Sequence, residues 1–246
     1  MRPLNLIISF LFLCTSFLNA QDIQETRIPM LGEMAPAFIA ESTKGKIDFP
    51  GDYNMKWKIL FSHPGDFTPV CSTELLELAV IQNDFTKLNT LLFVISTDGL
   101  NSHLAWQHSL EGINYKGHGQ VKINFPLITD ANLEISKKYG MIHFYNNTQK
   151  DVRGVFIINP ENKIEAIFFY SSKTGRNINE IKRTLIALQA ADAENILTPA
   201  NWIPGEEVLI ESPSTIEESE KLTKQNDPDI HSLAWYLWFR KKQSNQ

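Results

Sequence analysis

The residues with the clearest potential for chemistry lie in one short stretch, residues 61–75, around Cys71. Cys71 follows Thr68-Pro69, and Thr is favoured at a helix N-cap while Pro is favoured at the first helical position. This spacing predicts a helix that begins at Pro69 and carries Cys71 in its first turn. Unpaired N–H groups and the positive end of the helix dipole stabilise an anion there, which favours a thiolate. The position therefore predicts a nucleophilic sulfur.

The segments on both sides of Cys71 support this interpretation. An apolar, strand-like run at residues 57–61 enters the loop, and a helical stripe leaves it, formed by Leu78, Ile81, Phe85 and Leu88. Functional groups of α/β folds gather at such strand–loop–helix junctions. The alternative is that Cys71 is a small, buried and inert side chain, as most free cysteines are. The junction favours the reactive cysteine.

The stretch Phe61-Ser-His-Pro-Gly-Asp-Phe-Thr-Pro-Val-Cys71-Ser-Thr-Glu-Leu75 resembles the signature of peroxiredoxins, which are thiol peroxidases with a thioredoxin-like fold. The resemblance covers about residues 29–240 and is closest in kind to the one-Cys type of the alkyl hydroperoxide reductase C and thiol-specific antioxidant family. It implies an α/β fold, with a mixed central sheet flanked by helices and an extended C-terminal arm. It also implies a thiol-dependent peroxidase that reduces hydrogen peroxide and organic hydroperoxides.

The same resemblance implies a role for each residue of the site. Cys71 attacks the peroxide, Thr68 offers its hydroxyl to the thiolate and the peroxide, and Pro64 and Pro69 shield and shape the loop. Arg153 matches the arginine whose fixed charge favours the thiolate and holds the peroxide oxygens. An arginine near the start of an apolar strand also suggests an anionic partner on its own. The alternative for Arg153 is a surface position at a strand start.

His63 and Glu74 occupy positions beside the site that are typical of the family, and we interpret both as supporting residues. His63 could tune the thiolate or the incoming thiol, or be a hydrogen-bonded loop histidine. His103 and His108 are five residues apart and off a common helical face, so a metal pair is not expected. A packing or solvated role is expected for both, and no cofactor is predicted.

The cysteine count bears on how the oxidised enzyme is reduced. Attack on a peroxide would leave a sulfenic acid on Cys71. The chain has two cysteines, and the other, Cys14, lies in the predicted signal peptide. Some long-armed relatives have a resolving cysteine near the C-terminal aromatic run, but residues 233–240 contain none. Reduction by an external thiol is therefore predicted. Residues 51–57 contain no serine, so the phospholipase site of some one-Cys relatives is not expected.

Residues 1–20 are predicted to be a signal peptide, with export to the periplasm or secretion after cleavage near Ala20. Met1-Arg2 gives a positive start, and residues 4–18 are almost wholly apolar. The alternative is a buried N-terminal strand or helix. The apolar run is too short for a comfortable span, so stable membrane insertion is not expected. The formal net charge of −5, without a basic stripe, argues against nucleic acid as a partner.

The remaining pattern predicts the scaffold. Residues 91–96 form a continuous apolar run typical of a buried strand, and residues 152–159 and 163–170 predict a hairpin. Short helices are expected at residues 102–110 and 133–139, and a longer one after Ile178. A hydrophobic content of 43% is enough for a real core. We therefore predict a thioredoxin-like domain over residues 29–193.

Residues 194–246 are predicted to form a dimerisation arm without a core of its own. Trp235, Trp238 and Phe239 fit one face of a helical turn. Three exposed aromatics would be an aggregation liability, and a second copy of the chain is the expected cover, in a homodimer or a higher ring. Two other functions stay open at this point: a peroxide sensor or chaperone on the same fold, and a structural dimer module in which Cys71 is inert.

Overall fold

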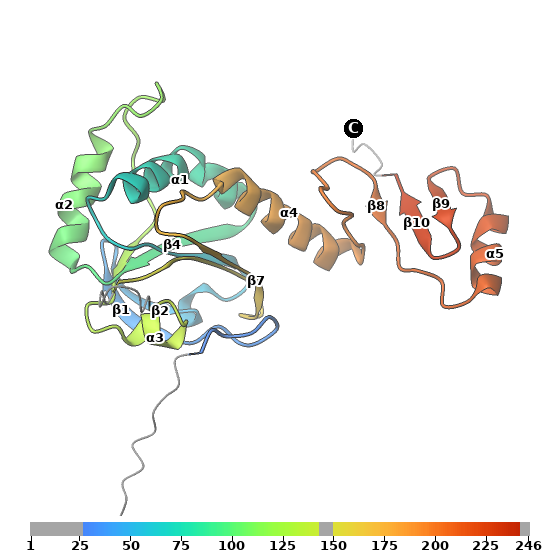
Figure 1. Cartoon of the computed structure of the whole chain (residues 1–246), viewed down its shortest axis with the longest axis horizontal. Coiled ribbons are helices and arrows are strands. Elements are labelled where there is room, and N and C mark those ends of the chain that lie inside the picture. Colours follow the sequence, from blue (N-terminus) through green and yellow to red (C-terminus); the bar gives the residue numbers. More distant parts are fainter. Residues whose placement is uncertain (1–26, 143–149, 242–246) are drawn as a thin grey trace, which may run out of the picture.

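A seven-stranded sheet forms the centre of the computed structural model, which describes residues 27–142 and 150–241 (Figure 1). The strand order is β2-β1-β5-β4-β3-β6-β7. The strands are Phe38–Ser42 (β1), Gly45–Phe49 (β2), Trp57–Ser62 (β3), Thr90–Ser96 (β4), Leu127–Thr129 (β5), Arg153–Ile158 (β6) and Ile164–Tyr170 (β7). β3, β4 and β5 run parallel, and the other neighbours are antiparallel. The predicted mixed sheet is confirmed.

The innermost strands are buried on both faces, as their continuous apolar runs predict. Every residue of β3 and of β6 is buried. β3 pairs with β4 in parallel from Trp57↔Thr90 to Ser62↔Ile95, so both strands end at the same edge of the sheet. The loop that leads to Cys71 therefore starts at a rigid point in the middle of this edge.

Helices cover the sheet on both faces. Pro69–Lys87 (α1), Leu100–Glu111 (α2) and Ile178–Glu194 (α4) pack on one hydrophobic cluster, which contains Ile59, Val94 and Ile157 from the strands. The short helix Glu134–Lys138 (α3) and the β1–β2 hairpin cover the opposite cluster. A single 3-10 turn, Gly51–Tyr53 (η1), follows β2. No helix among residues 27–142 and 150–241 is long and apolar enough to cross a membrane.

The C-terminal segment projects from the body at the end of α4 (Figure 1). It contains Val208–Leu209 (β8), Ile216–Gln225 (α5), Ile230–Ala234 (β9) and Leu237–Arg240 (β10), with the sheet order β8-β10-β9. A small cluster of Ala187, Ile196, Trp202 and Val208 joins it to α4. The arm packs on α4, which supplies one side of this small cluster. The predicted division of the chain at residue 194 falls on the last residue of α4.

The predicted helical turn at residues 235–239 is wrong. These residues lie in a β-hairpin, in which Trp235 and Tyr236 form the turn between β9 and β10. Trp238 lies in β10 and points inward, where it is 3% exposed, whereas Trp235 lies in the turn and is 47% exposed. The pairing of β10 with both β8 and β9 outweighs the local helical spacing. The predicted signal peptide, including Cys14, lies outside the described residues.

Candidate active site

Cys71 occupies the predicted position in the first turn of α1. Thr68 is the N-cap residue in extended conformation, Pro69 follows at the first helical position, and Cys71 is fully buried. The Thr68 hydroxyl does not cap the helix but donates to the Gly65 carbonyl at 2.9 Å. The first-turn N–H groups therefore keep their positive character at the level of the sulfur, which stabilises an anion there.

Arg153 brings a second positive group to the sulfur from β6, which lies antiparallel to β3. Its Nη1 lies 3.2 Å from Cys71 Sγ. Nε and Nη2 donate to the Ser172 carbonyl at 3.2 and 3.0 Å, which fixes the plane of the guanidinium. Arg153 is 3% exposed, so the surface alternative is wrong. A guanidinium held at this distance places a fixed positive charge and an N–H donor beside the sulfur.

Glu74, one turn after Cys71 in α1, binds two buried arginines. Its Oε2 accepts from Arg153 Nη1 and from Arg176 Nη2, each at 2.8 Å. Arg176 also donates to Glu74 Oε1 and to the carbonyls of Ser62 and Gly154. This buried cluster contains two guanidinium groups and one carboxylate, so it carries one surplus positive charge. A thiolate on Cys71 would balance that charge, because buried charges are stable only when paired.

Arg176 is the main residue of the site that sequence reasoning missed. It lies in the loop before α4, 102 residues from Glu74, and no local pattern marks it. One indirect signal existed: Glu74 precedes Leu75 on the buried side of a helix, and a buried carboxylate needs more than one donor.

His63 is fully buried at the end of β3, and neither ring nitrogen has a hydrogen-bond partner in the described part of the chain. The nearest carboxylate oxygen, Asp66 Oδ1, is 3.8 Å from Nε2. The pKa of His63 lies well below its ordinary value because burial penalises the charged form and because His103, Arg176 and Arg153 repel it. Burial therefore favours the neutral ring of His63, which packs near Trp106, with ring centroids 5.1 Å apart.

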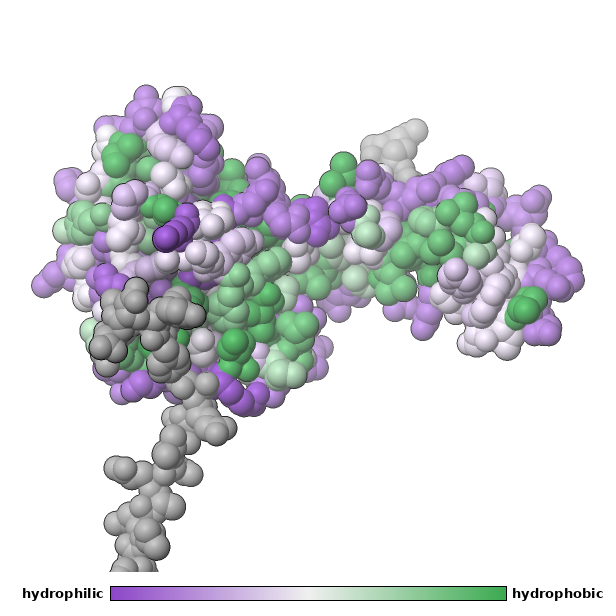
Figure 2. Space-filling model, in the orientation of Figure 1, coloured by the Kyte–Doolittle hydropathy of each residue, from purple (hydrophilic) through white to green (hydrophobic). Residues whose placement is uncertain are grey.

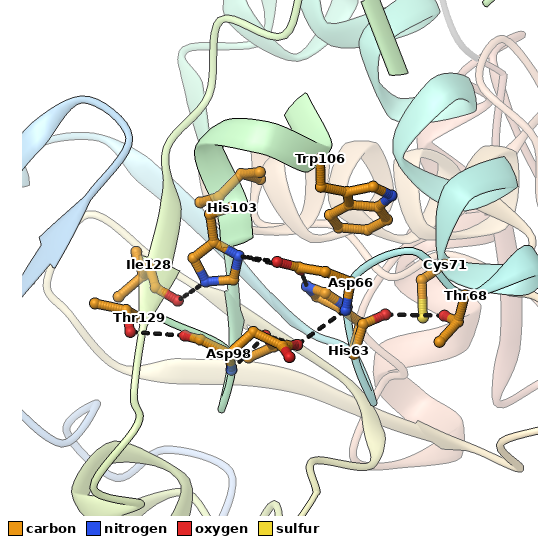
Figure 3. Close-up of polar contacts among 12 residues, drawn as sticks. His63, Asp66, Thr68, Cys71, Asp98, His103, Trp106, Ile128 and Thr129 are labelled. Atoms are coloured by element: carbon orange, nitrogen blue, oxygen red, sulfur yellow. Dashed lines mark hydrogen bonds and ion pairs between the residues drawn. The ribbon is translucent and has the colours of Figure 1, made fainter. Parts of the chain in front are cut away.

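The other residues expected around the site lie as follows. Pro64 is half-buried and Pro69 is exposed at the start of α1. His103 is buried and packed, whereas His108 is exposed on the same helix, so both fulfil the expectation of packing or solvated roles. Sequence reasoning also missed Asp66, whose carboxylate contacts His103 Nδ1 at 2.9 Å, as Figure 3 shows.

Comparison with known proteins identifies the class to which this fold and this site belong. Residues 31–167 match the AhpC/TSA family, and residues 187–226 match the C-terminal domain of 1-Cys peroxiredoxin. The chain is 46% identical to a peroxiredoxin of Methanosarcina mazei over 215 residues, which are 87% of this chain and 98% of the relative. It is 39% identical to a peroxiredoxin of Aquifex aeolicus over 224 residues, 87% of this chain and 97% of that one.

Solved structures agree with this assignment. A yeast mitochondrial 1-Cys peroxiredoxin superimposes with a TM-score of 0.76 at 34% identity, covering 87% of this chain and all of the other. The peroxiredoxin 6 of Arenicola marina, solved as a cysteine-to-serine mutant, gives a TM-score of 0.77 at 31% identity, covering 88% and 100%. The chain belongs to the AhpC/TSA family of peroxiredoxins and has the thioredoxin-like fold. It is a thiol-dependent peroxidase, and the sensor, chaperone and purely structural alternatives are not favoured.

Proposed function

We propose that Cys71 is the sulfur that reduces the peroxide. The observation that carries this proposal is the 3.2 Å contact between Arg153 Nη1 and Cys71 Sγ within a buried cluster of surplus positive charge. The thiolate attacks one peroxide oxygen, an S–O bond forms, and the O–O bond breaks. The leaving oxygen takes up a proton and departs as water or an alcohol. Cys71 is left as a sulfenic acid, two electrons more oxidised.

Arg153 and Thr68 have complementary roles in this step. Arg153 places N–H donors where negative charge moves from sulfur to oxygen, and such fixed donors lower the barrier for charge transfer. Thr68 lies three residues before Cys71, so the two side chains share the same side of the first turn. Its hydroxyl donates to the Gly65 carbonyl at 2.9 Å and keeps its lone pairs free to accept from the hydroperoxide O–H.

An external thiol is the proposed reductant. Cys71 is the free cysteine among the described residues, and Cys14 lies in the predicted signal peptide. A first thiol would displace water from the sulfenic acid to form a mixed disulfide, and a second would release the Cys71 thiol and a disulfide of the reductant. The yeast relative has a thiol-resolving mechanism through glutathione and thioredoxin systems. Peroxide consumption by wild type and Cys71→Ser with glutathione, thioredoxin and small dithiols tests both proposals; activity retained without Cys71 would contradict them.

A homodimer is proposed from the surface of the C-terminal arm, residues 195–241. Leu233, Trp235 and Tyr236 are 72%, 47% and 55% exposed at the tip of the β9–β10 hairpin. Figure 2 shows hydrophobic residues along this arm. Contiguous exposed aromatics of this kind mark an interface, and an arm that projects from the body can reach a second copy. Sedimentation distinguishes a monomer, a dimer and a higher ring.

Export is proposed from the pattern of residues 1–20, a positive start followed by an apolar run and a small residue at Ala20. Cell fractionation and mass measurement of the mature protein test it. Mature protein outside the cytoplasmic fraction with its N-terminus near Gln21 is the expected result, and an intact N-terminus inside the cell would contradict export.

A further inference from the structure

A second buried charge pair lies beside the loop of residues 63–68, which leads from β3 to Cys71. The Asp66 carboxylate contacts His103 Nδ1 through both oxygens, at 2.9 and 3.1 Å. The two side chains are 1% and 0% exposed. His103 Nε2 lies 3.1 Å from the Ile128 carbonyl of β5, so the ring joins the loop to the sheet (Figure 3). The peroxide chemistry proposed above uses neither residue.

The contacts of the ring indicate how this pair is hydrogen-bonded. The Ile128 carbonyl can only accept, so His103 Nε2 donates to it. On the other side of the ring, Nδ1 faces a carboxyl group. Both hydrogen bonds form together only when the ring is an imidazolium beside a carboxylate, or when Asp66 carries the proton itself. In either state the proton between Asp66 and His103 is hydrogen-bonded on both sides. A buried pair whose hydrogen bonds are all satisfied keeps its two side chains in fixed positions.

Asp66 is fixed through its backbone as well. Its N–H donates to Asp98 Oδ2 at 2.9 Å, and that oxygen also accepts from Ser96 Oγ at 2.9 Å at the end of β4. The loop residue is therefore held through its main chain by Asp98, which Ser96 at the end of β4 anchors, and through its side chain by α2 and β5. All three of these elements belong to the rigid body of the fold.

The residue after Asp66 shows what this attachment holds in place. Phe67 has a φ of 55°, in the left-handed region, although it carries a large side chain that is 59% exposed. L residues other than glycine are strained there, and such strain persists only when the surroundings enforce it. The enforcing points are Asp66 on one side and the start of α1 at Thr68 on the other. Released from Asp66, Phe67 would relax to negative φ and carry Thr68 with it.

We infer that Asp66 and His103 are positioning residues for peroxide reduction, which hold Phe67 in its strained conformation and so keep Thr68 and the pocket around Cys71 in their reactive arrangement. This inference rests on the proposed role of Cys71. Phe67 lies near Trp106, with ring centroids 6.4 Å apart, and Trp106 donates to Ser72 Oγ, next to Cys71, at 3.3 Å, so a shift of the loop reaches the surroundings of the sulfur through direct contacts.

Two rates measured on the same variants test the inference. One is reduction of hydrogen peroxide, which needs the ordered site, and the other is alkylation of Cys71 by iodoacetamide, which needs access to a sulfur that is 0% exposed. Asp66→Ala should slow peroxide reduction by about tenfold or more, since small misplacements of reacting groups have effects of this size. Alkylation should become several-fold faster in the same variant. A purely structural role would not move the two rates in opposite directions.

Matched variants complete the design. Asp66→Asn should behave nearly as wild type, because its amide can donate to His103 Nδ1 while Nε2–H still bonds to Ile128. Ser136→Ala removes another buried hydrogen bond, to Asp130 Oδ2, without touching the loop, and should leave both rates unchanged. Wild-type rates in Asp66→Ala would overturn the inference, as would Asp66→Asn being as slow as Asp66→Ala.

A second variant provides the test if Asp66→Ala does not fold. The double variant Asp66→Leu/His103→Leu replaces both polar partners with apolar ones, which costs less than leaving one unpaired. It should show the same opposite changes in the two rates, and parallel changes would overturn the inference. Peroxidase activity surviving in Cys71→Ser would contradict the proposed role of Cys71 itself, whereas unchanged rates in the loop variants with an inactive Cys71→Ser would contradict the positioning role alone.

Discussion

One nitrogen of Arg153 serves both Glu74 and Cys71: Nη1 lies 2.8 Å from Glu74 Oε2 and 3.2 Å from Cys71 Sγ. The carboxylate and the sulfur therefore face the same donor. Arg176 relieves this competition, because it satisfies both oxygens of Glu74 from the other side. The arrangement leaves the positive charge of Arg153 beside the sulfur of Cys71.

Replacement of Arg153 by alanine should remove the surplus positive charge that balances the thiolate. At neutral pH the fraction of Cys71 present as thiolate should fall, and peroxide reduction should slow by about a hundredfold, the usual effect of losing one preorganised donor. Stopped-flow peroxide consumption and thiolate absorbance measure the two effects. Arg27→Ala, on an exposed ion pair with Glu33, is the matched control. An unchanged thiolate fraction would exclude Arg153 from the role proposed for it.

Replacement of Glu74 by glutamine should separate stability from thiolate formation. Two buried guanidinium groups would then face no carboxylate, and breaking a buried pair in this way costs about 3–5 kcal/mol. The free energy of unfolding should fall in denaturant titrations, while the fraction of thiolate should not decrease. Glu77→Gln, which breaks the exposed pair with Lys116, should cost about 1 kcal/mol or less. Equal losses in the two variants would contradict the buried network.

His63 should make the protein sensitive to acid. Its pKa in the folded state is depressed well below the ordinary value of 6.5, chiefly by burial, so the unfolded state binds a proton more readily. The stability associated with the neutral ring is present above that value and is lost as the pH falls below it, by up to about 1.4 kcal/mol per pH unit. His63→Leu should show a shallower loss of unfolding free energy between pH values of about 6.5 and 5.

The control for this measurement is His118→Leu, because His118 is exposed and its removal should leave the acid dependence of wild type unchanged. Parallel curves for His63→Leu and wild type would show that His63 does not stay neutral in the folded protein.

Oxidation by one equivalent of peroxide should convert Cys71 to a sulfenic acid that a 1,3-dione traps. No intramolecular disulfide should form in the mature chain, because Cys71 would be its only cysteine. Mass spectrometry of peptides from wild type and Cys71→Ser measures the adduct. A disulfide between the Cys71 residues of two chains as the main product would indicate a different cycle.

Polar substitutions at the tip of the β9–β10 hairpin should weaken the proposed dimer. Leu233→Glu and Trp235→Ser remove exposed apolar surface that burial would stabilise by about 25 cal/mol per Å². Sedimentation should show more monomer, and peroxide reduction should slow if the arm supports the site across the interface. Ile39→Ser, at a residue of β1 that is 60% exposed, provides the control. A dimer of unchanged stability would place the interface elsewhere.

Local sequence preferences explain why the position of Cys71 could be predicted. Thr68-Pro69 sets the start of α1, and therefore the place of Cys71, without help from the rest of the chain. The apolar strands were equally predictable, because burial on both faces leaves a continuous pattern. Arg153 was recognisable for the related reason that a charge in such a strand needs a partner.

The missed residues depend on contacts between distant parts of the chain. Asp66 meets His103 across 37 residues, and Glu74 meets Arg176 across 102, so neither pair leaves a periodic signal. The hairpin at residues 230–240 was mistaken for a helical turn because Trp235, Trp238 and Phe239 have a helical spacing over a short run. Pairing with β8 favours the strand instead, and β8 is only two residues long.

Helix α4 belongs to two cores at once: Leu185 packs in the core of the body, and Ala187 packs in the small cluster of the arm. The rotation of this one helix about its own axis therefore sets the direction in which the arm leaves the body. Inserting one residue after Leu185 would rotate everything beyond it by about 100°, whereas an insertion of four would rotate it by only about 40°. The direction of the arm is thus encoded as an angle, and insertions in α4 would change that angle in steps that follow the helical period.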